Sequence, residues 1–388
     1  MAKRRISGAL VALLVVLCLL IGFVAGFAGM AEYRTPASDN RTPASDNRTP
    51  ASDNRTPAGD KAPVGGDISI NGDISINFLE LGNAYTGDCT FIQVGTVDIL
   101  IDAGSRTGSI PTIAEFVKDR MKDDLLDYVV VTHAHQDHYA GFATGASTES
   151  LFDMFNVGTI IDFALTNQKD DSAMYKNYLR ERQEAIDRGA NHLTAAECIQ
   201  NKQDVFKLSD SVSMRILDSK YYYEKSSSEN DYSVCTLFSQ GENHYLFTGD
   251  LEAGGEAALV ARNDLPEVTL YKAGHHGSKT SSSEALLRVI RPKIVCVCCC
   301  AGSTEYTKAD ENTFPTQAFV DRIAPYTKQV YVTTLCVDYK AKTYTSMNGT
   351  ITVSVKNGAI AVECSASNKV LKEWDWFREH RNCPEAWK

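Results

Sequence analysis

A dense cluster of metal-ligand residues directly follows one apolar segment of the chain. Residues 126–132 have the composition of a buried strand, and the next six residues contain three histidines and one aspartate, at His133, His135, Asp137 and His138. Alternate side chains of an extended segment point the same way, so His133 and His135 can bind one metal ion. Asp137 and His138 then turn toward a second ion. The spacing predicts a metal centre that holds two ions.

A two-metal site needs a carboxylate that bridges the ions, and Asp250 is the candidate. It ends the apolar segment 245–249, where a buried carboxylate is costly unless a cation accompanies it. The alternative for Asp250 is to cap the helix that is predicted at 254–263.

The last ligand is expected from two adjacent histidines, His275 and His276. Adjacent side chains that leave a strand diverge, so we assign His276 to the metal and His275 to the substrate. Ser278 and Lys279 follow, just before a helix predicted at 283–290. Hydroxyls, a positive charge and exposed N–H groups suit an anion, and the alternative is helix capping alone.

The elements that would position these residues alternate between strands and helices, which is typical of a layered α/β fold. Strands are predicted at 73–81, 89–94, 97–102, 126–132, 212–218, 232–239, 243–249, 267–272, 293–299, 329–334, 349–355 and 359–364. Helices are predicted at 111–123, 170–188, 254–263 and 283–290.

Four stretches of the sequence carry a resemblance to a known family. They are Gly87-Asp88 with the strand end Ile101–Gly104, Thr132–His138 with Gly141, Phe247–Asp250, and Gly274–Lys279. Over about residues 73–363 the chain resembles the metallo-β-lactamase-fold hydrolases, in the branch similar to the hydrolase domain of ComEC/Rec2-type competence proteins. The resemblance implies an αββα sandwich with a two-metal site at the sheet edges, and hydrolysis of phosphodiesters or related esters.

The chain departs from this family at the first metal site. Many relatives bind the first metal through a third histidine that lies between the histidine cluster and the bridging aspartate. Between His138 and Asp250 this chain has only His192 and His244. His244 is excluded because it precedes Asp250 by six residues on one predicted strand, a distance of about 20 Å at about 3.3 Å per residue.

A predicted hairpin offers a substitute for the third histidine. Its turn is centred on Gly241, which would place Tyr232 opposite Asp250. Asn230 and Asp231 would then lie beside Asp250, in a segment that resembles the Asn-rich, Ser-containing segment of the same branch. We expect Asn230 or Asp231 to line or complete the first site, and the alternative is a plain turn.

A second departure lies at Asn312-Thr-Phe-Pro315, where relatives often have Asn-x-Tyr-Gly-His-Pro. The chain keeps Asn and Pro but has no His there. Any role of that histidine in leaving-group protonation or substrate contact is therefore not carried over to this chain.

The residues and the resemblance together predict a metal-dependent hydrolase, most simply a phosphodiesterase or related esterase. A hydroxide held between two ions would attack phosphorus or an acyl carbon, with Asp137, Asp250 and His275 as the catalytic residues. Zinc is the favoured metal, and manganese or iron suit the same ligands. The alternatives are a nuclease acting on extracellular DNA, a catalytically silent metal-binding or sensor module, and a cell-envelope scaffold.

The charge balance bears on the substrate. The 388 residues include 39 Lys+Arg and 49 Asp+Glu, which gives a net charge of −10. This balance disfavours nucleic acid as the partner without excluding it, and it favours small or zwitterionic esters.

Residues 1–31 predict a membrane anchor or a signal peptide. No charged residue occurs over 6–31, which is long enough to cross a bilayer, and Lys3, Arg4 and Arg5 precede this segment. A signal anchor would give a single-pass protein with its catalytic domain outside the cell membrane. Cleavage of a signal peptide would instead give a secreted protein.

Residues 32–65 are predicted to be a low-complexity linker. Three copies of Arg-Thr-Pro-Ala-Ser-Asp-Asn fill 34–54, and with a proline in every unit and no large apolar side chain they predict a spacer. The hydrolase domain is expected over 66–364. The remaining residues, 365–388, hold all three tryptophans and predict a docked helix or a tail.

Four of the eleven cysteines lie on one predicted strand, at Cys296, Cys298, Cys299 and Cys300. Neighbouring residues of a strand point to opposite faces, so this group indicates neither a disulfide nor a zinc knuckle. We expect these side chains to act as small apolar residues of the core.

Overall fold

The structure is a computed structural model and describes residues 74–143, 149–169, 172–356 and 359–388. The predicted anchor or signal peptide and the repeat linker lie outside the described residues. The chain divides into two units, and the second unit, Gly65–Lys388, contains the described residues. Within the described ranges, no helix has both the length and the apolar character needed to cross a membrane.

Two eight-stranded sheets form the centre of this part of the chain. The first sheet has the order β16 (Ala359–Cys364), β15 (Ile351–Lys356), β1 (Ile74–Phe78), β2 (Thr90–Val94), β3 (Val97–Ile101), β4 (Leu125–Val130), β5 (Asn156–Asp162) and β6 (Asn191–Thr194). The second has the order β14 (Thr343–Ser346), β13 (Gln329–Asp338), β12 (Ile294–Ala301), β11 (Leu270–Lys272), β10 (Asn243–Phe247), β9 (Thr236–Gln240), β8 (Val212–Ile216) and β7 (Val205–Lys207).

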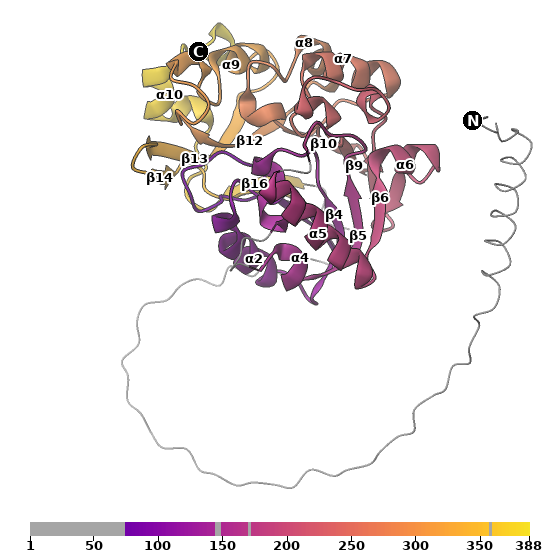
Figure 1. Ribbon diagram of the computed structural model, residues 1–388. Coiled ribbons are helices and arrows are strands. Elements are labelled where there is room, and N and C mark those ends of the chain that lie inside the picture. The colour runs from indigo at the N-terminus through magenta and orange to yellow at the C-terminus, as the bar shows by residue number, and fades with distance from the viewer. Residues whose placement is uncertain (1–73, 144–148, 170–171, 357–358) are drawn as a thin grey trace, which may run out of the picture. The chain divides into compact units, whose positions relative to one another are not determined.

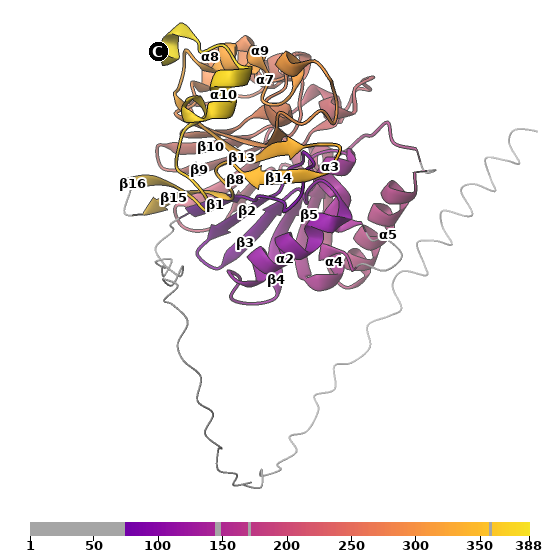
Figure 2. The same ribbon diagram turned by 90° about the vertical axis from the view of Figure 1, so that its left-hand side faces the viewer.

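Helices cover the outer face of each sheet, as Figure 2 shows. The first sheet carries α2 (Ile110–Lys118), α4 (Leu151–Met154) and α5 (Ala173–Asp187), and the second carries α7 (Ala253–Arg262), α8 (Glu284–Ile290), α9 (Gln317–Ile323) and α10 (Asp375–His380). The short helices α3 (Gln136–Tyr139) and α6 (Ala195–Gln200) follow β4 and β6. The prediction of an α/β fold with two sheets is confirmed.

Each sheet contains four neighbouring strands that run parallel. In the first sheet β3, β4, β5 and β6 pair in parallel, and in the second β10, β11, β12 and β13 do so. Figure 1 shows β4, β5 and β6 side by side. In parallel α/β sheets, ligands bind beyond the carboxyl ends of the strands. These strand ends are therefore the place where the predicted ligand residues should meet.

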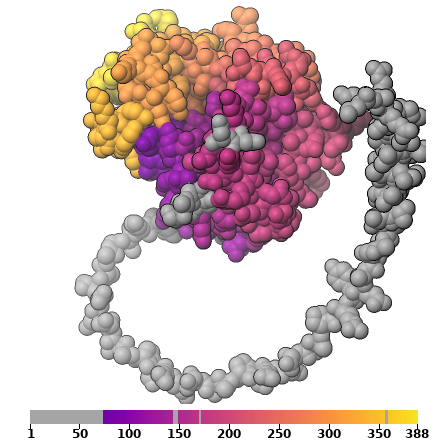
Figure 3. Space-filling model, viewed as in Figure 1, coloured from indigo at the N-terminus to yellow at the C-terminus, as the bar shows by residue number. Residues whose placement is uncertain are grey.

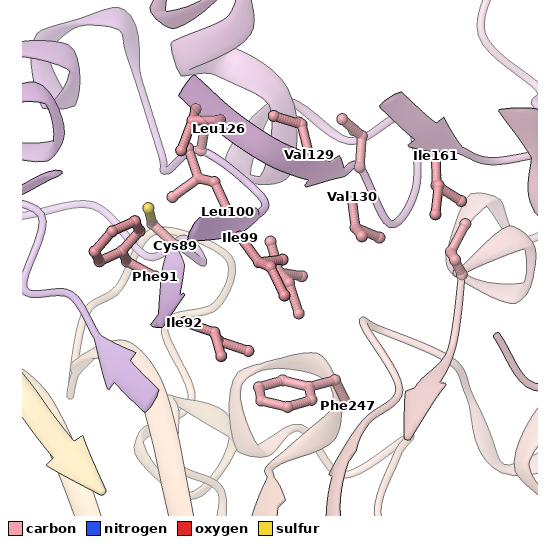
Figure 4. Packing of buried hydrophobic residues seen from close by; sticks show 14 of the residues in the cluster. Cys89, Phe91, Ile92, Ile99, Leu100, Leu126, Val129, Val130, Ile161 and Phe247 are labelled. Atoms are coloured by element: carbon pink, nitrogen blue, oxygen red, sulfur yellow. The ribbon is translucent and has the colours of Figure 1, made fainter. Parts of the chain in front are cut away.

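The core between the sheets explains why these segments form strands. Neighbouring residues of a strand point to opposite faces of the sheet. A continuous apolar run therefore packs on one side against the other sheet and on the other side against the helices. In Figure 4, Ile92 and Ile99 of the first sheet lie over the ring of Phe247 of the second, whereas Phe91 and Leu100 point the other way. All five side chains are at most 2% exposed.

Eight of the helices and strands named above were not predicted from local patterns: β5, β6, β7, β14, α3, α4, α6 and α9. Three of these are edge strands of their sheets. Edge strands are short and half exposed, so they lack the alternation of apolar and polar residues that marks a buried strand. The burial of β6 and β14 follows no period-two pattern, for example.

The C-terminal residues form a docked helix rather than a free tail. Trp387 and Phe377 are 2% and 1% exposed, and the indole N–H of Trp387 donates to the carbonyl of Thr327 at 2.8 Å. In Figure 3 these late segments, coloured orange and yellow, pack directly on the rest of the described surface. More than one aromatic side chain therefore fixes the C-terminus.

The cysteine group on β12 is buried and unbonded. Cys296, Cys298, Cys299 and Cys300 are all at most 3% exposed and are free thiols. Burial raises the pKa of the Cys296 thiol well above its usual value, so this thiol stays protonated. The group fills the sheet as small apolar side chains, as predicted.

Candidate metal centre

The predicted ligand residues lie at the carboxyl ends of three parallel strands. His133–His138 follow β4, Asp250 follows β10, and His275 and His276 follow β11. Ligand atoms of His133, His138 and Asp250 lie within 4.8 Å of one another, and so do those of Asp137, His138 and His276. The fold thus brings together residues that are widely separated in the sequence.

The backbone is strained where these side chains leave the strands. His275 and His276 have φ of 48° and 55°, and Gly277 follows with φ of 77°. A left-handed conformation costs a residue with a side chain roughly 1–2 kcal/mol. Such strain persists only where the surrounding structure enforces it, and it collects at functional sites.

A buried carboxylate orients His138. Nδ1 of His138 donates to Oδ2 of Asp102 at 2.8 Å, and Asp102 also accepts from the backbone N–H and the hydroxyl of Thr132, both at 2.8 Å. The proton is therefore held on Nδ1, and Nε2 turns to within 3.2 Å of Oδ2 of Asp250. In the sequence Asp102 stands out only as part of the strand end Ile101–Gly104, which predicts no role for its side chain.

The two adjacent histidines occupy different environments. His276 is 1% exposed, and its Nδ1 donates to the carbonyl of Cys298 at 2.9 Å, while its Nε2 lies 3.3 Å from Oδ2 of Asp250 and 3.4 Å from Oδ2 of Asp137. The side chain of His275 is 22% exposed, and its Nε2 is 3.9 Å from Oδ2 of Asp250. His276 thus lies within the cluster and His275 at its margin.

His133 and His135 face each other at the other end of the cluster. Nε2 of His133 lies 3.0 Å from Nδ1 of His135. Burial lowers the pKa of His133 well below its usual value, and the charge of His138 lowers it further. His133 is therefore a neutral imidazole, which is the form that binds a metal.

An internal ion pair at the site was not anticipated. Lys272, the last residue of β11, is 3% exposed and forms a salt bridge with Asp88, and its Nζ lies 3.8 Å from Oδ1 of Asp250. Burial alone would lower the pKa of Lys272, but the carboxylates of Asp88 and Asp250 raise it above its usual value. The sequence signal that could have indicated this ion pair is the position of Lys272, a charged residue at the end of an apolar strand.

Protons on His138 and His276 balance the negative charge of the carboxylates that Lys272 does not neutralise. Burial alone would lower the pKa of His138, but the carboxylates of Asp250 and Asp102 raise it well above its usual value. The pKa of His276 is likewise raised by Asp250 and Asp88 against the effect of burial. Both imidazoles therefore carry a proton that a bound cation would replace.

The donor atoms fit a divalent cation. Nε2 of His138, Nε2 of His276 and Oδ1 of Asp250 are buried and have no hydrogen-bond partner within the part of the chain that the structure describes. Buried polar atoms normally have partners. Imidazole nitrogen and carboxylate oxygen are also the ligands that zinc, manganese and iron accept.

The hairpin register differs by one residue from the prediction. Gln240 pairs with Asn243 across a loop of two residues, so Ser233, not Tyr232, comes opposite Asp250. The hydroxyl of Ser233 accepts from the backbone N–H of Asp250 at 3.0 Å. The turn is therefore centred between residues 241 and 242 rather than on Gly241.

Asn230 and Asp231, which were expected beside Asp250, contact different side chains. Asp231 accepts from the hydroxyl of Ser226 at 2.5 Å, and no metal-type cluster among the described residues includes it. Nδ2 of Asn230 donates to Glu252 at 3.3 Å, while its buried Oδ1 has no hydrogen-bond partner in the described ranges. Of the two, only Asn230 has a buried side-chain oxygen without a hydrogen-bond partner among the described residues.

Ser278 and Lys279 are held in the segment that follows His276. Ser278 is 5% exposed, and its hydroxyl accepts from the backbone N–H of Thr280 at 3.2 Å. Lys279 is exposed, and its Nζ donates to Oδ1 of Asn312 at 3.1 Å. Capping of α8 falls to Ser283, whose hydroxyl accepts from Leu286 N–H.

Two aromatic residues at the rim were missed. The ring of Phe314 lies 5.9 Å from His275 and 5.7 Å from His276, measured between centroids. Tyr306 packs on Phe314 at 5.7 Å, and its hydroxyl donates to Oδ2 of Asp137 at 2.8 Å. Tyr306 lies in no motif, and Phe314 was noted only as part of Asn312–Pro315, so neither residue was given a role from the sequence.

Comparisons with known proteins agree with this arrangement. Residues 82–148 match the family model of the metallo-beta-lactamase superfamily. Recombination protein 2 of Haemophilus influenzae is 42% identical over 69 residues, which are 18% of this chain and 8% of that protein. ComE operon protein 3 of Bacillus subtilis is 26% identical over 172 residues, which are 43% of this chain and 19% of that protein.

The chain spans less than a fifth of the length of these curated relatives. Among solved structures, the metallo-beta-lactamase fold protein YhfI from Bacillus subtilis is similar with a TM-score of 0.33 and 12% identity, over 52% of this chain and 71% of that one. The described residues form an α/β fold with two sheets, the match over residues 82–148 is to the metallo-beta-lactamase superfamily, and the chain is homologous over part of its length to Recombination protein 2 and ComE operon protein 3.

Proposed function

We propose that this protein is a two-metal hydrolase that cleaves phosphodiesters or related esters. The observation that carries the proposal is a set of buried imidazole and carboxylate atoms that converge at the strand ends and have no hydrogen-bond partner among the residues that the structure describes. A polar pocket of this kind costs folding free energy unless a cation occupies it.

The chain's residues divide between two ions. His133 and His135 would hold the first, Asp137, His138 and His276 the second, and Asp250 both. Bound metals lower the pKa of a water molecule and neutralise charge that develops on the substrate. Zinc is the favoured ion, with manganese or iron as the alternatives.

The surrounding residues prepare these ligands. Asp102 and the carbonyl of Cys298 hold protons on Nδ1 of His138 and His276, so that each Nε2 faces the cluster. His275 lies at the margin, with its Nδ1 3.0 Å from the hydroxyl of Thr280. This marginal place supports the proposal that His275 meets the substrate rather than an ion.

The substrate is proposed to be a small ester rather than a long polyanion, because the net charge of the chain is −10. A nuclease is the second candidate, since one relative bears the name Recombination protein 2. We propose action outside the cell membrane, either from an anchored chain or from a secreted one, on the basis of residues 1–31.

The test is hydrolysis by the purified full chain of bis(p-nitrophenyl) phosphate, and in parallel of single-stranded DNA, with added zinc or manganese. Variants His135→Ala and Asp250→Ala should lose activity and bound metal. His380→Ala, which changes a half-exposed histidine far along the chain on α10, should keep both.

Two outcomes would contradict the proposal. Full activity in His135→Ala and Asp250→Ala would remove the metal assignment. A wild-type protein that binds fewer than two ions and hydrolyses neither substrate would instead support a silent sensor module.

A further inference from the structure

The segment between β12 and α9 crosses the rim of the metal centre and is anchored at both ends. Its base is closed by a hydrogen bond from Gly302 N–H to the carbonyl of Phe314 at 2.9 Å. Glu305 accepts from the backbone N–H of Thr86 and from Arg106, each at 2.9 Å. The residue that follows Glu305 is therefore held in a defined place.

That residue is Tyr306, whose phenol touches the ligand cluster from the solvent side. Its hydroxyl lies 2.8 Å from Oδ2 of Asp137, the same oxygen that is 3.4 Å from Nε2 of His276. Tyr306 is 56% exposed, whereas His276 and Asp250 are each 1% exposed. A molecule that approaches the cluster from this side meets the phenol first.

The aromatic packing keeps the phenol at this position. The ring of Tyr306 rests on Phe314, which in turn packs on both His275 and His276. Phe314 belongs to the segment Asn312–Pro315, in which the chain has no histidine. The rim therefore offers a hydroxyl donor against an apolar ring, next to the imidazole of His275.

We propose that Tyr306 is a substrate-binding residue whose hydroxyl donates a hydrogen bond to an oxygen of the phosphoryl or ester group. The inference rests on the proposed hydrolase function and adds to it the residue that recognises the reacting group. A neutral phenol is a strong donor, and a donor placed where negative charge develops stabilises the transition state. In the structure this hydroxyl donates to a carboxylate oxygen of Asp137. A phosphoryl oxygen is likewise a negatively charged hydrogen-bond acceptor.

The competing explanation is that Tyr306 only orients Asp137 as a metal ligand. The two roles differ in what the loss of the hydroxyl would change. A positioning role predicts weaker metal binding, and a substrate role predicts weaker binding of an anion with the metals retained.

The experiment compares the wild-type full chain with Tyr306→Phe, which keeps the ring that packs on Phe314. Bound metal is counted, kcat and KM are measured on bis(p-nitrophenyl) phosphate, and binding of radiolabelled inorganic phosphate is measured by equilibrium dialysis. Tyr344→Phe on β14, another exposed tyrosine, is the matched control.

We expect Tyr306→Phe to keep its metal, to lose kcat/KM on the order of 10²-fold, and to bind phosphate more weakly, while Tyr344→Phe matches wild type. Loss of metal from Tyr306→Phe, with activity restored by excess metal, would overturn the substrate role. Unchanged kcat/KM and phosphate binding would overturn it as well. If the wild type is inactive, the hydrolase proposal fails. The phosphate-binding measurement still tests Tyr306 in that case, because equal phosphate affinity of wild type and variant would overturn its role as a substrate-binding residue.

Discussion

At the scale of single residues, the metal centre depends on which nitrogen of each imidazole carries a proton. His138 and His276 both donate from Nδ1, one to Asp102 and the other to the carbonyl of Cys298. The partner of Nδ1 fixes the orientation of the ring and directs Nε2 to the metal. Nδ1 of His275 lies 3.0 Å from the hydroxyl of Thr280, and the carboxylate of Glu252 is farther away, at 3.9 Å.

This difference predicts distinct losses in two alanine variants. His276→Ala should release about one of two ions and lower activity at all substrate concentrations, because it removes a ligand. His275→Ala should retain both ions and lower turnover by about 10²–10⁴-fold, as expected for a lost acid or positioning group. Metal counting alongside kinetics checks both. If His275→Ala loses the ion and His276→Ala keeps it, the assignment is reversed.

Protonation of the same residues predicts that metal binding depends on pH. The pKa values of His138 and His276 are raised, mainly by Asp250 acting against burial, so both imidazoles are protonated at neutral pH when no metal is bound. A metal ion must displace these protons. Affinity should therefore rise as the pH rises toward the folded-state pKa values, and fall at lower pH.

Calorimetric titration of zinc in two buffers of different ionisation enthalpy measures this proton release. We expect about one proton from each of the two histidines at pH 7. A titration heat that is independent of the buffer would show that the imidazoles are already neutral, contrary to the prediction.

At the scale of elements, the turn after β11 carries the strain that places His275 and His276. Gly277 ends this turn with φ of 77°, and a Cβ atom there would lie 2.9 Å from Cβ of Pro315. Glycine is therefore required both by its conformation and by the close approach of another segment.

Gly277→Ala should lower the free energy of unfolding by about 1–3 kcal/mol and reduce the bound metal, because the turn must move away from Pro315. Urea unfolding and metal counting provide the measurements. Gly108→Ala is the control, since a Cβ there has no atom within 4 Å. Equal stability of the two variants would show that the turn adapts without strain.

At the scale of the whole folded unit, the C-terminal helix supports the rim of the metal centre. Arg381 is 6% exposed, and its guanidinium donates to the carbonyls of Pro315 and Thr313 at 2.9 and 2.7 Å. These acceptors flank Phe314, which packs on both histidines of the turn. The C-terminal residues thus hold the segment around Phe314 in place through the buried side chain of Arg381.

Arg381→Ala should lower the free energy of unfolding by about 2–4 kcal/mol, since it leaves two buried carbonyls without donors. Arg378→Ala, on the same helix, removes only an exposed ion pair with Asp375 and should change stability by less than about 0.5 kcal/mol. Denaturant titration of both variants makes the comparison. Similar values for the two would show that the C-terminal helix does not support the rim.

Much of the site could be predicted from the sequence because its signals are local. A metal site is predicted because four ligand-type residues lie within six positions after an apolar strand, at His133, His135, Asp137 and His138. Apolar alternation likewise predicted most of the strands that carry the ligands, since period-two burial is a property of neighbouring residues.

Only the tertiary structure decided the contacts between distant segments. Asp88 meets Lys272, Asp102 meets His138, and Tyr306 meets Asp137 across 169 positions. The first and third pairings join the two sheets, and the second joins the ends of the neighbouring strands β3 and β4. No local pattern of the sequence encodes either kind of contact. The hairpin shows the same limit on a smaller scale: a two-residue loop instead of one centred on a single glycine shifts the register by one residue and sets Ser233 against Asp250.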